Sequence, residues 1–178
     1  MLDNKKIVCV IPARFHSTRF PKKILAPLGG KPLIQWAWDA AKKVSLFDEV
    51  LIALEHEETA KVVDSFHGRY VMTSNSLRSG TERLIDVMGQ HIVDGDIWVN
   101  WQADEPFLDE RMIRDLLMEA HRDDVDVWTL RKLLEKEEEI QSPNIVKVVC
   151  DLKGFALYFS RLPIPYYRDG GIDRTYAP

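Results

Sequence analysis

A short loop after the first apolar run of the sequence carries an unusual concentration of positive charge. The run KIVCVI (residues 6–11) ends at Pro12. The residues that follow include four cations and two hydroxyls and no carboxylate: Arg14, Arg19, Lys22, Lys23, Ser17 and Thr18. Proteins bind phosphate groups with cationic side chains, hydroxyls and backbone N–H groups. We therefore expect this loop to bind a ligand with several negative charges.

A second polar group follows another apolar run, DIWVNWQ (residues 96–102), which leads to Gln102, Asp104 and Glu105. In an open parallel sheet, ligands bind beyond the carboxyl ends of the strands, so both groups would meet at one edge. A carboxylate there can hold the Mg²⁺ that bridges phosphate oxygens. A nucleoside triphosphate fits this combination best, although the sequence has no G-x-x-x-x-G-K-[ST] motif.

Each of these features also has a simpler interpretation. Basic side chains in a surface loop are often only solvated, and Asp104 or Glu105 could favour the start of a helix. Arg78 and Arg83, near SGTER, could be ordinary helix-face charges. The histidines show no metal-ligand spacing, and no nucleophilic triad is indicated.

The elements that must position these residues alternate between strand and helix, which predicts an α/β fold with a mainly parallel twisted sheet and helices on both faces. Strands are expected at 6–11, 48–54, 69–73, 96–102 and 126–133, and helices at 32–44, 58–66, 79–91 and 111–123. Residues 135–143 form an acidic polar stretch. Residues 144–160 predict an antiparallel hairpin that turns at 151–154.

Length and composition limit the class of protein. The chain of 178 residues predicts one domain, 1–178, and the net charge of −4 lacks the basic excess of a nucleic-acid-binding protein. No apolar run is long enough for membrane insertion, and no signal peptide is evident. Cys9 and Cys150 lie in apolar runs, so a disulfide is not expected and we predict a cytoplasmic protein.

Six motifs carry a resemblance to a known family. They are IPAR-x-x-STR-x-P-x-K, GGKPLI, SGTER, NWQADEP, NIVKVV and FALYFSR-x-x-IP, in that order from Ile7 to about Arg168. This pattern closely resembles the 3-deoxy-D-manno-octulosonate cytidylyltransferases, also called CMP-Kdo synthetases. Several unrelated motifs at compatible spacings make the resemblance specific.

The resemblance implies a nucleotide-diphospho-sugar transferase (Rossmann-like) fold and an Mg²⁺-dependent reaction in lipopolysaccharide precursor synthesis. CTP and the sugar acid would give CMP-sugar and pyrophosphate. Arg14, Lys23 and Asp104 would be catalytic, with Asp104 the metal ligand. The nucleotide-binding residues implied are Ala13, Arg14, Ser17, Thr18, Arg19, Lys23, Arg78, Ser79 and Gly80. Gln102, Arg161 and Arg168 would bind the sugar acid, whose carboxylate suits a guanidinium.

The chain departs from the family pattern at several positions. Lys22 stands where Gly is usual, Ile24 where Pro is usual, Arg78 where Gln is usual and Ala103 where Gly is usual. Family members also continue beyond this hairpin, with further sugar and metal ligands, so the domain is expected to be incomplete at its C-terminus. Two functions stay open: a cytidylyltransferase, or a nucleotide-binding remnant with little turnover. The full-length protein would be a homodimer. A third hypothesis, a glycosyltransferase, has less support, because Ala103-Asp104-Glu105 is not the D-x-D metal motif that such enzymes usually have.

Overall fold

Two compact units make up the chain, Met1–Trp128 and Thr129–Pro178, and each is described by itself. The computed structural model describes residues 5–16 and 20–166. Ser17, Thr18, Arg19 and Arg168, which the sequence places in the candidate site, lie outside the described residues.

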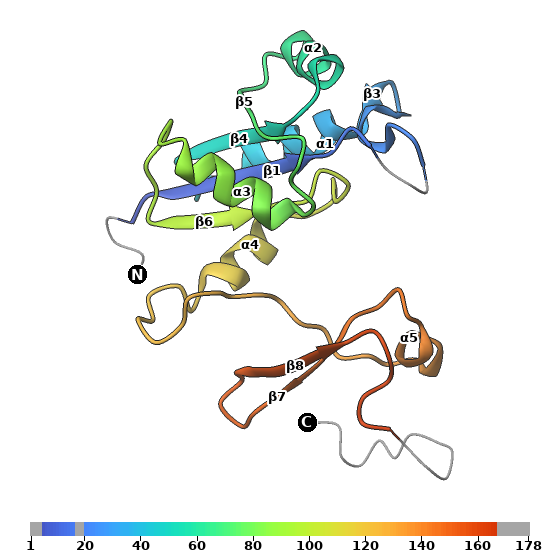
Figure 1. Cartoon of the computed structure of the whole chain (residues 1–178). Coiled ribbons are helices and arrows are strands. Elements are labelled where there is room, and N and C mark those ends of the chain that lie inside the picture. Colours follow the sequence, from blue (N-terminus) through green and yellow to red (C-terminus); the bar gives the residue numbers. More distant parts are fainter. Residues whose placement is uncertain (1–4, 17–19, 167–178) are drawn as a thin grey trace. The chain divides into compact units, whose positions relative to one another are not determined.

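The first unit is built on a parallel sheet of four strands in the order β5-β4-β1-β6 (Figure 1). Its strands are β1 (Ile7–Ala13), β4 (Glu49–Leu54), β5 (Tyr70–Met72) and β6 (Ile97–Asn100). In the register, Val8 lies opposite Glu49 and Ala13 opposite Leu54, while Ile7 pairs with Ile97. Because every pairing is parallel, the carboxyl ends of all four strands meet at one edge of the sheet.

Helices cover both faces of this sheet, as the sequence predicts. The helices of the first unit are α1 (Leu33–Lys43), α2 (Glu57–Ser65), α3 (Gly80–Gly89) and α4 (Glu110–Leu117). The side chains of β1 alternate between the two faces. Val8 and Val10 pack with α3, whereas Cys9 and Ile11 belong to the larger core that contains residues of α1, α2 and α4. Strand β1, buried along its whole length, therefore holds its last residues rigidly.

A small hairpin between β1 and α1 was not predicted. It pairs β2 (Pro27–Leu28) with β3 (Lys31–Pro32) and follows a 3-10 turn, η1 (Lys23–Leu25). Gly29 and Gly30 join the two strands with φ of 58° and 87°. A two-residue turn with positive φ at both positions favours glycine, which explains the GG pair.

The second unit contains a short helix, α5 (Glu137–Gln141), and the predicted antiparallel hairpin of β7 (Lys147–Cys150) and β8 (Ala156–Ser160). Asp151 organises the turn, because its Oδ1 accepts hydrogen bonds from the backbone N–H groups of Lys153 and Phe155, both at 2.9 Å. Gly154 completes the turn with φ of 90°. The hairpin prediction is confirmed.

One lysine is buried at the start of this hairpin. Lys147 is 4% exposed, and its Nζ donates hydrogen bonds to the carbonyls of Ser142 at 2.5 Å, Ile145 at 3.0 Å and Arg161 at 3.0 Å. An ammonium has three donors. All three are therefore used by backbone carbonyls, which fixes the chain on both sides of the hairpin.

The strand predicted at 126–133 is wrong. The structure has neither helix nor strand there, and three apolar side chains on which the prediction depended are exposed: Val127 by 82%, Leu130 by 45% and Leu133 by 62%. A strand requires a hydrogen-bonded neighbour. In the described residues this segment pairs with no strand, and it crosses the boundary between the two units.

Among the described residues, no helix combines the length and the apolar character needed to cross a lipid bilayer.

Candidate active site

The candidate site is formed by the segments that leave the carboxyl ends of the four parallel strands. Arg14 follows β1 directly and is exposed, while Ala13 before it is fully buried. Arg14 Nη1 donates a hydrogen bond to the carbonyl of Arg78 at 2.9 Å. The loop after β1 is thus joined to the segment that leads into α3, as expected for two parts of one nucleotide site.

Lys23 and Asp104 form an ion pair at the same edge. Lys23 begins η1, Asp104 lies four residues beyond the end of β6, and Nζ lies 2.6 Å from Oδ2. Each side chain is 44% exposed. The structure therefore brings together the predicted phosphate-binding lysine and the predicted metal-binding carboxylate, with both accessible to a ligand.

The start of α3 approaches the end of β6 closely. Ser79 caps the helix, because its Oγ accepts a hydrogen bond from the N–H of Glu82 at 3.1 Å. Gly80 follows, and a Cβ atom added there would lie 3.3 Å from Gln102 Nε2 and 3.3 Å from Pro12 Cγ. A side chain at position 80 would displace one of these neighbours, so glycine allows this close contact.

The Gln102 side chain is held in place by a second contact. Its Nε2 donates to Oδ1 of Asn100, the last residue of β6, at 2.9 Å. The carboxamide therefore lies beside the N-terminus of α3, where the predicted nucleotide-binding and sugar-binding residues meet.

Two functional candidates were missed by the sequence analysis. Arg83 was interpreted as a possible helix-face charge, but it is buried, with its side chain 1% exposed, and its Nη1 lies 3.4 Å from Oε2 of Glu55. Burial lowers the pKa of the Arg83 guanidinium from its ordinary value, and the charge of Glu55 partly opposes that change. Glu55 comes directly after β4, as Asp104 comes shortly after β6. This position at a strand end is the feature of the sequence that could have identified Glu55 as a site residue.

An aromatic stack supports the loop after β1. Phe15 is buried and stacks on His56, with ring centroids 3.7 Å apart and an angle of 3° between the rings. The Lys22 Nζ lies 4.9 Å from the centroid of Phe15 and forms an exposed ion pair of 2.7 Å with Glu58. Both lysines therefore form ion pairs within the protein, but the partner of Lys22 is a carboxylate at the start of α2, whereas the partner of Lys23 is Asp104, the predicted metal ligand.

The predicted sugar-acid ligands are distributed differently. Arg161 belongs to the second unit, where it is exposed and its Nη1 donates to the carbonyl of Pro143 at 2.9 Å. Within the described residues, no group of three or more His, Cys, Asp or Glu side chains is arranged to hold a metal ion. Asp104 is thus a single carboxylate and not part of a preformed metal cluster.

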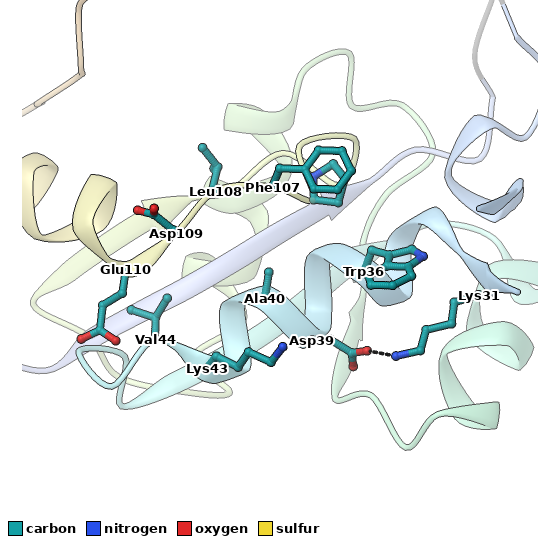
Figure 2. Close-up of a pocket in the computed structure, with 11 residues that line it drawn as sticks. Lys31, Trp36, Asp39, Ala40, Lys43, Val44, Phe107, Leu108, Asp109 and Glu110 are labelled. Atoms are coloured by element: carbon teal, nitrogen blue, oxygen red, sulfur yellow. Dashed lines mark hydrogen bonds and ion pairs between the residues drawn. The ribbon is translucent and has the colours of Figure 1, made fainter. Parts of the chain in front are cut away.

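A separate hollow of about 360 Å³ lies between α1 and the segment before α4 (Figure 2). Trp36 and Phe107 face it, and an ion pair of 2.6 Å joins Lys31 and Asp39 at its rim. None of the residues predicted for the nucleotide or the sugar acid lines this hollow.

A family model described as cytidylyltransferase matches residues 8–176, nearly the whole chain. The chain belongs to the cytidylyltransferase family. Among curated relatives, this cytidylyltransferase is 42% identical over 168 residues to the 3-deoxy-manno-octulosonate cytidylyltransferase of Thermodesulfovibrio yellowstonii, covering 91% of this chain and 66% of the relative. The corresponding protein of Geotalea daltonii is 43% identical over 165 residues, covering 92% and 64%.

A solved structure supports the same relationship. CMP:2-keto-3-deoxy-manno-octonic acid synthetase complexed with CTP matches this cytidylyltransferase with a TM-score of 0.79 and 38% identity, over 92% of this chain and 67% of that one. The predicted fold class is therefore confirmed. The chain spans somewhat less than two thirds of the length of the two curated relatives.

Proposed function

We propose that this cytidylyltransferase transfers CMP from CTP to a 3-deoxy-manno-octulosonic sugar acid, as the names of its relatives describe. The observation that carries the proposal is the pairing of Lys23 with Asp104 at the carboxyl edge of the sheet, beside the loop of Arg14. This edge offers cations for phosphates and a carboxylate for a metal, which are the groups that nucleotidyl transfer requires.

In the proposed reaction the anomeric hydroxyl of the sugar acid attacks the α-phosphorus of CTP. A bond forms between the hydroxyl oxygen and the α-phosphorus, the bond from that phosphorus to the bridging oxygen of the β-phosphate breaks, and pyrophosphate leaves with that oxygen. The hydroxyl proton passes from the attacking oxygen to solvent water. No protein nucleophile is needed, so catalysis is positioning and charge stabilisation.

The chain's own residues have separate roles in this proposal. Lys23 and Arg14 offset negative charge on the phosphates, because both are cations at the strand edge with exposed side chains. Ala13, Arg78, Ser79 and Gly80 shape the nucleotide pocket where the loop after β1 meets the start of α3. Ser17, Thr18 and Arg19 add further phosphate contacts by their place in the motif.

A magnesium ion fits the donor set. Mg²⁺ is usually bound by one or two carboxylates together with substrate phosphates and water. Asp104 supplies one accessible carboxylate, and no described cluster would bind the metal without the nucleotide. We therefore propose that Asp104 holds Mg²⁺ only together with the triphosphate, where the ion would supply Lewis-acid stabilisation of phosphate charge.

By their places in the sequence motifs alone, we propose Gln102, Arg161 and Arg168 as ligands of the sugar acid. Gln102 is the member of this set in the first unit, and its carboxamide lies against the N-terminus of α3. Guanidinium groups suit the carboxylate of a sugar acid because they donate two parallel hydrogen bonds. We further propose a cytoplasmic location and, for the full-length protein, a homodimer. The exposed Leu157, Tyr158 and Phe159 of β8 offer an apolar surface for pairing.

The test measures binding and turnover on the whole chain. CTP binding is measured by calorimetry with Mg²⁺, and pyrophosphate release is measured with CTP, Mg²⁺ and the sugar acid, with UTP and ATP as controls. We expect CTP-selective binding and release of pyrophosphate only when the sugar acid is present. Binding without any release would favour the nucleotide-binding remnant, and absence of binding would reject the proposed function.

A further inference from the structure

A buried ion pair lies next to the start of the phosphate loop. The side chains of Glu55 and Arg83 are 9% and 1% exposed, so the pair is almost completely removed from water. Its closest charged atoms, Arg83 Nη1 and Glu55 Oε2, are 3.4 Å apart. Neither residue carries one of the roles that we assigned to ligand binding.

Glu55 uses its two oxygens on two different parts of the fold. Oε1 accepts a hydrogen bond from the backbone N–H of Phe15 at 2.9 Å, and Oε2 faces Arg83. Phe15 is the residue after Arg14, the candidate phosphate ligand. One carboxylate therefore joins the start of the phosphate loop to helix α3, which carries Arg83.

Arg83 extends the connection to a third strand end. Its Nη1 donates to the hydroxyl of Thr73 and to the carbonyl of Ser74, the latter at 3.5 Å. Thr73 is itself tied to β4, because its hydroxyl donates to the carbonyl of Leu54 at 2.9 Å. The pair thus links the segments that leave β1, β4 and β5.

The Glu55–Arg83 pair is not the arrangement that would give the folded protein its highest stability. No described residue hydrogen-bonds to Glu55 Oε2 or to Arg83 Nε, although both atoms are buried. Apolar side chains often replace a buried ion pair without loss of stability, because they avoid the cost of removing charges from water. What an apolar pair lacks is an acceptor for the Phe15 N–H and a donor for the loop after β5.

We propose that Glu55 and Arg83 are positioning residues that fix the backbone at Phe15 and thereby the guanidinium of Arg14 for the nucleotide phosphates. The inference rests on the proposed function of the site, since it assigns Arg14 to phosphate. Fixing a charged group before the ligand arrives removes an ordering cost from binding. Removing the pair should therefore have a large effect on the order of the loop and on CTP affinity. Its effect on the free energy of unfolding should be smaller.

The central variant is Glu55→Met/Arg83→Met, which removes both charges and keeps two unbranched side chains. We expect a melting temperature close to that of the parent. Amide hydrogen exchange at Phe15, followed by NMR without nucleotide, should accelerate by at least about tenfold because the N–H loses its acceptor. The Kd for CTP should rise by about tenfold.

Two further variants separate the contributions. Glu55→Gln/Arg83→Met is also uncharged but keeps an oxygen acceptor, so Phe15 should exchange more slowly and CTP should bind more tightly than in the Met/Met variant. Asp39→Asn, on α1, breaks the partly exposed ion pair with Lys31 of β3 and serves as the matched control, with parental exchange at Phe15 and parental CTP affinity.

The proposal is overturned if Phe15 exchanges at the parental rate in the Met/Met variant, or if exchange accelerates while the Kd for CTP stays within about twofold of the parent. Should that variant fail to fold, Arg83→Lys carries the test. It keeps a cation beside Glu55 but loses the planar guanidinium that bonds Thr73 and Ser74, so faster exchange at Phe15 in a folded Arg83→Lys protein supports the proposal and parental exchange opposes it. Failure of the parent to bind CTP would reject the proposed function instead, because the exchange measurement uses no nucleotide.

Discussion

The Nζ atom of Lys23 lies 2.6 Å from Oδ2 of Asp104, so the two residues that we assign to the phosphates and to the metal neutralise each other in the free protein. Both side chains are 44% exposed, and an exposed ion pair contributes at most about 1 kcal/mol. In the proposed function, a nucleotide with its metal ion would therefore separate the pair at little cost. In the free protein the contact keeps both groups together at the strand edge, and both stay accessible to solvent.

We expect Asp104→Asn to reduce Mg²⁺-dependent turnover by about a hundredfold or more while the melting temperature stays near that of the parent. The carboxamide keeps the shape of the side chain but loses the charge that would hold the metal against the triphosphate. Turnover is measured as a function of Mg²⁺ concentration. Asp64→Asn, an exposed carboxylate on α2, is the control and should leave the curve unchanged. Parental turnover of Asp104→Asn at limiting Mg²⁺ would show that the metal role is wrong.

Lys23→Ala should weaken CTP binding by about tenfold, since a hydrogen bond to a charged group contributes roughly 1.5 kcal/mol or more. Lys22→Ala should change the affinity by less than about twofold, because the Lys22 ammonium already contacts Glu58 and the Phe15 ring. Calorimetric titration of the two variants with CTP makes the comparison. Equal losses would indicate a diffuse positive patch in place of one positioned ammonium.

Lys22→Gly should be more stable than Lys22→Ala by about 1 kcal/mol. Lys22 adopts a left-handed backbone conformation, with φ of 55° and ψ of 32°, which a side chain disfavours and glycine accepts. Both variants lose the contacts to Glu58 and Phe15, so their difference isolates the backbone. The measurement is the urea midpoint of unfolding. If Ala and Gly give the same midpoint, position 22 carries no backbone strain.

Gly80→Ala should lower kcat/KM by roughly threefold or more, because its Cβ would lie 3.3 Å from Gln102 Nε2 and from Pro12 Cγ and would shift one of them. Gly89→Ala is the matched control at the other end of α3, where an added Cβ would meet nothing within 4 Å. That substitution should raise stability by up to about 1 kcal/mol and leave kcat/KM unchanged. An unaffected Gly80→Ala enzyme would mean that the position of Gln102 does not matter.

The spacing of apolar residues in the sequence predicted helices and strands of the central sheet unit, each of which buries at least one face. Strand β1 and helix α3 fall where their apolar residues place them, since burial determines both. The segment 126–133 has strand-like residues but no hydrogen-bonded neighbour among the described residues, and a sequence pattern does not reveal whether a pairing partner is available.

The candidate site was predictable where a residue follows a strand end and carries a charge that suits the ligand. Lys23 and Asp104 met that condition, and the structure places them in contact. Arg83 did not, because a charged residue in a helix is normally solvated and its burial depends on Glu55, 28 positions earlier in the chain. The side-chain partner of a buried charge is a tertiary property.

Lys23 and Lys147 would respond differently to ionic strength. The Lys23 ammonium faces a carboxylate in water, where dissolved ions compete for both partners and screen their attraction over about 10 Å at 0.1 M salt. The Lys147 ammonium is enclosed by three backbone carbonyls and is 4% exposed, so dissolved anions have little access to it. High salt should therefore loosen the resting arrangement of the candidate active site while the base of the hairpin keeps its geometry.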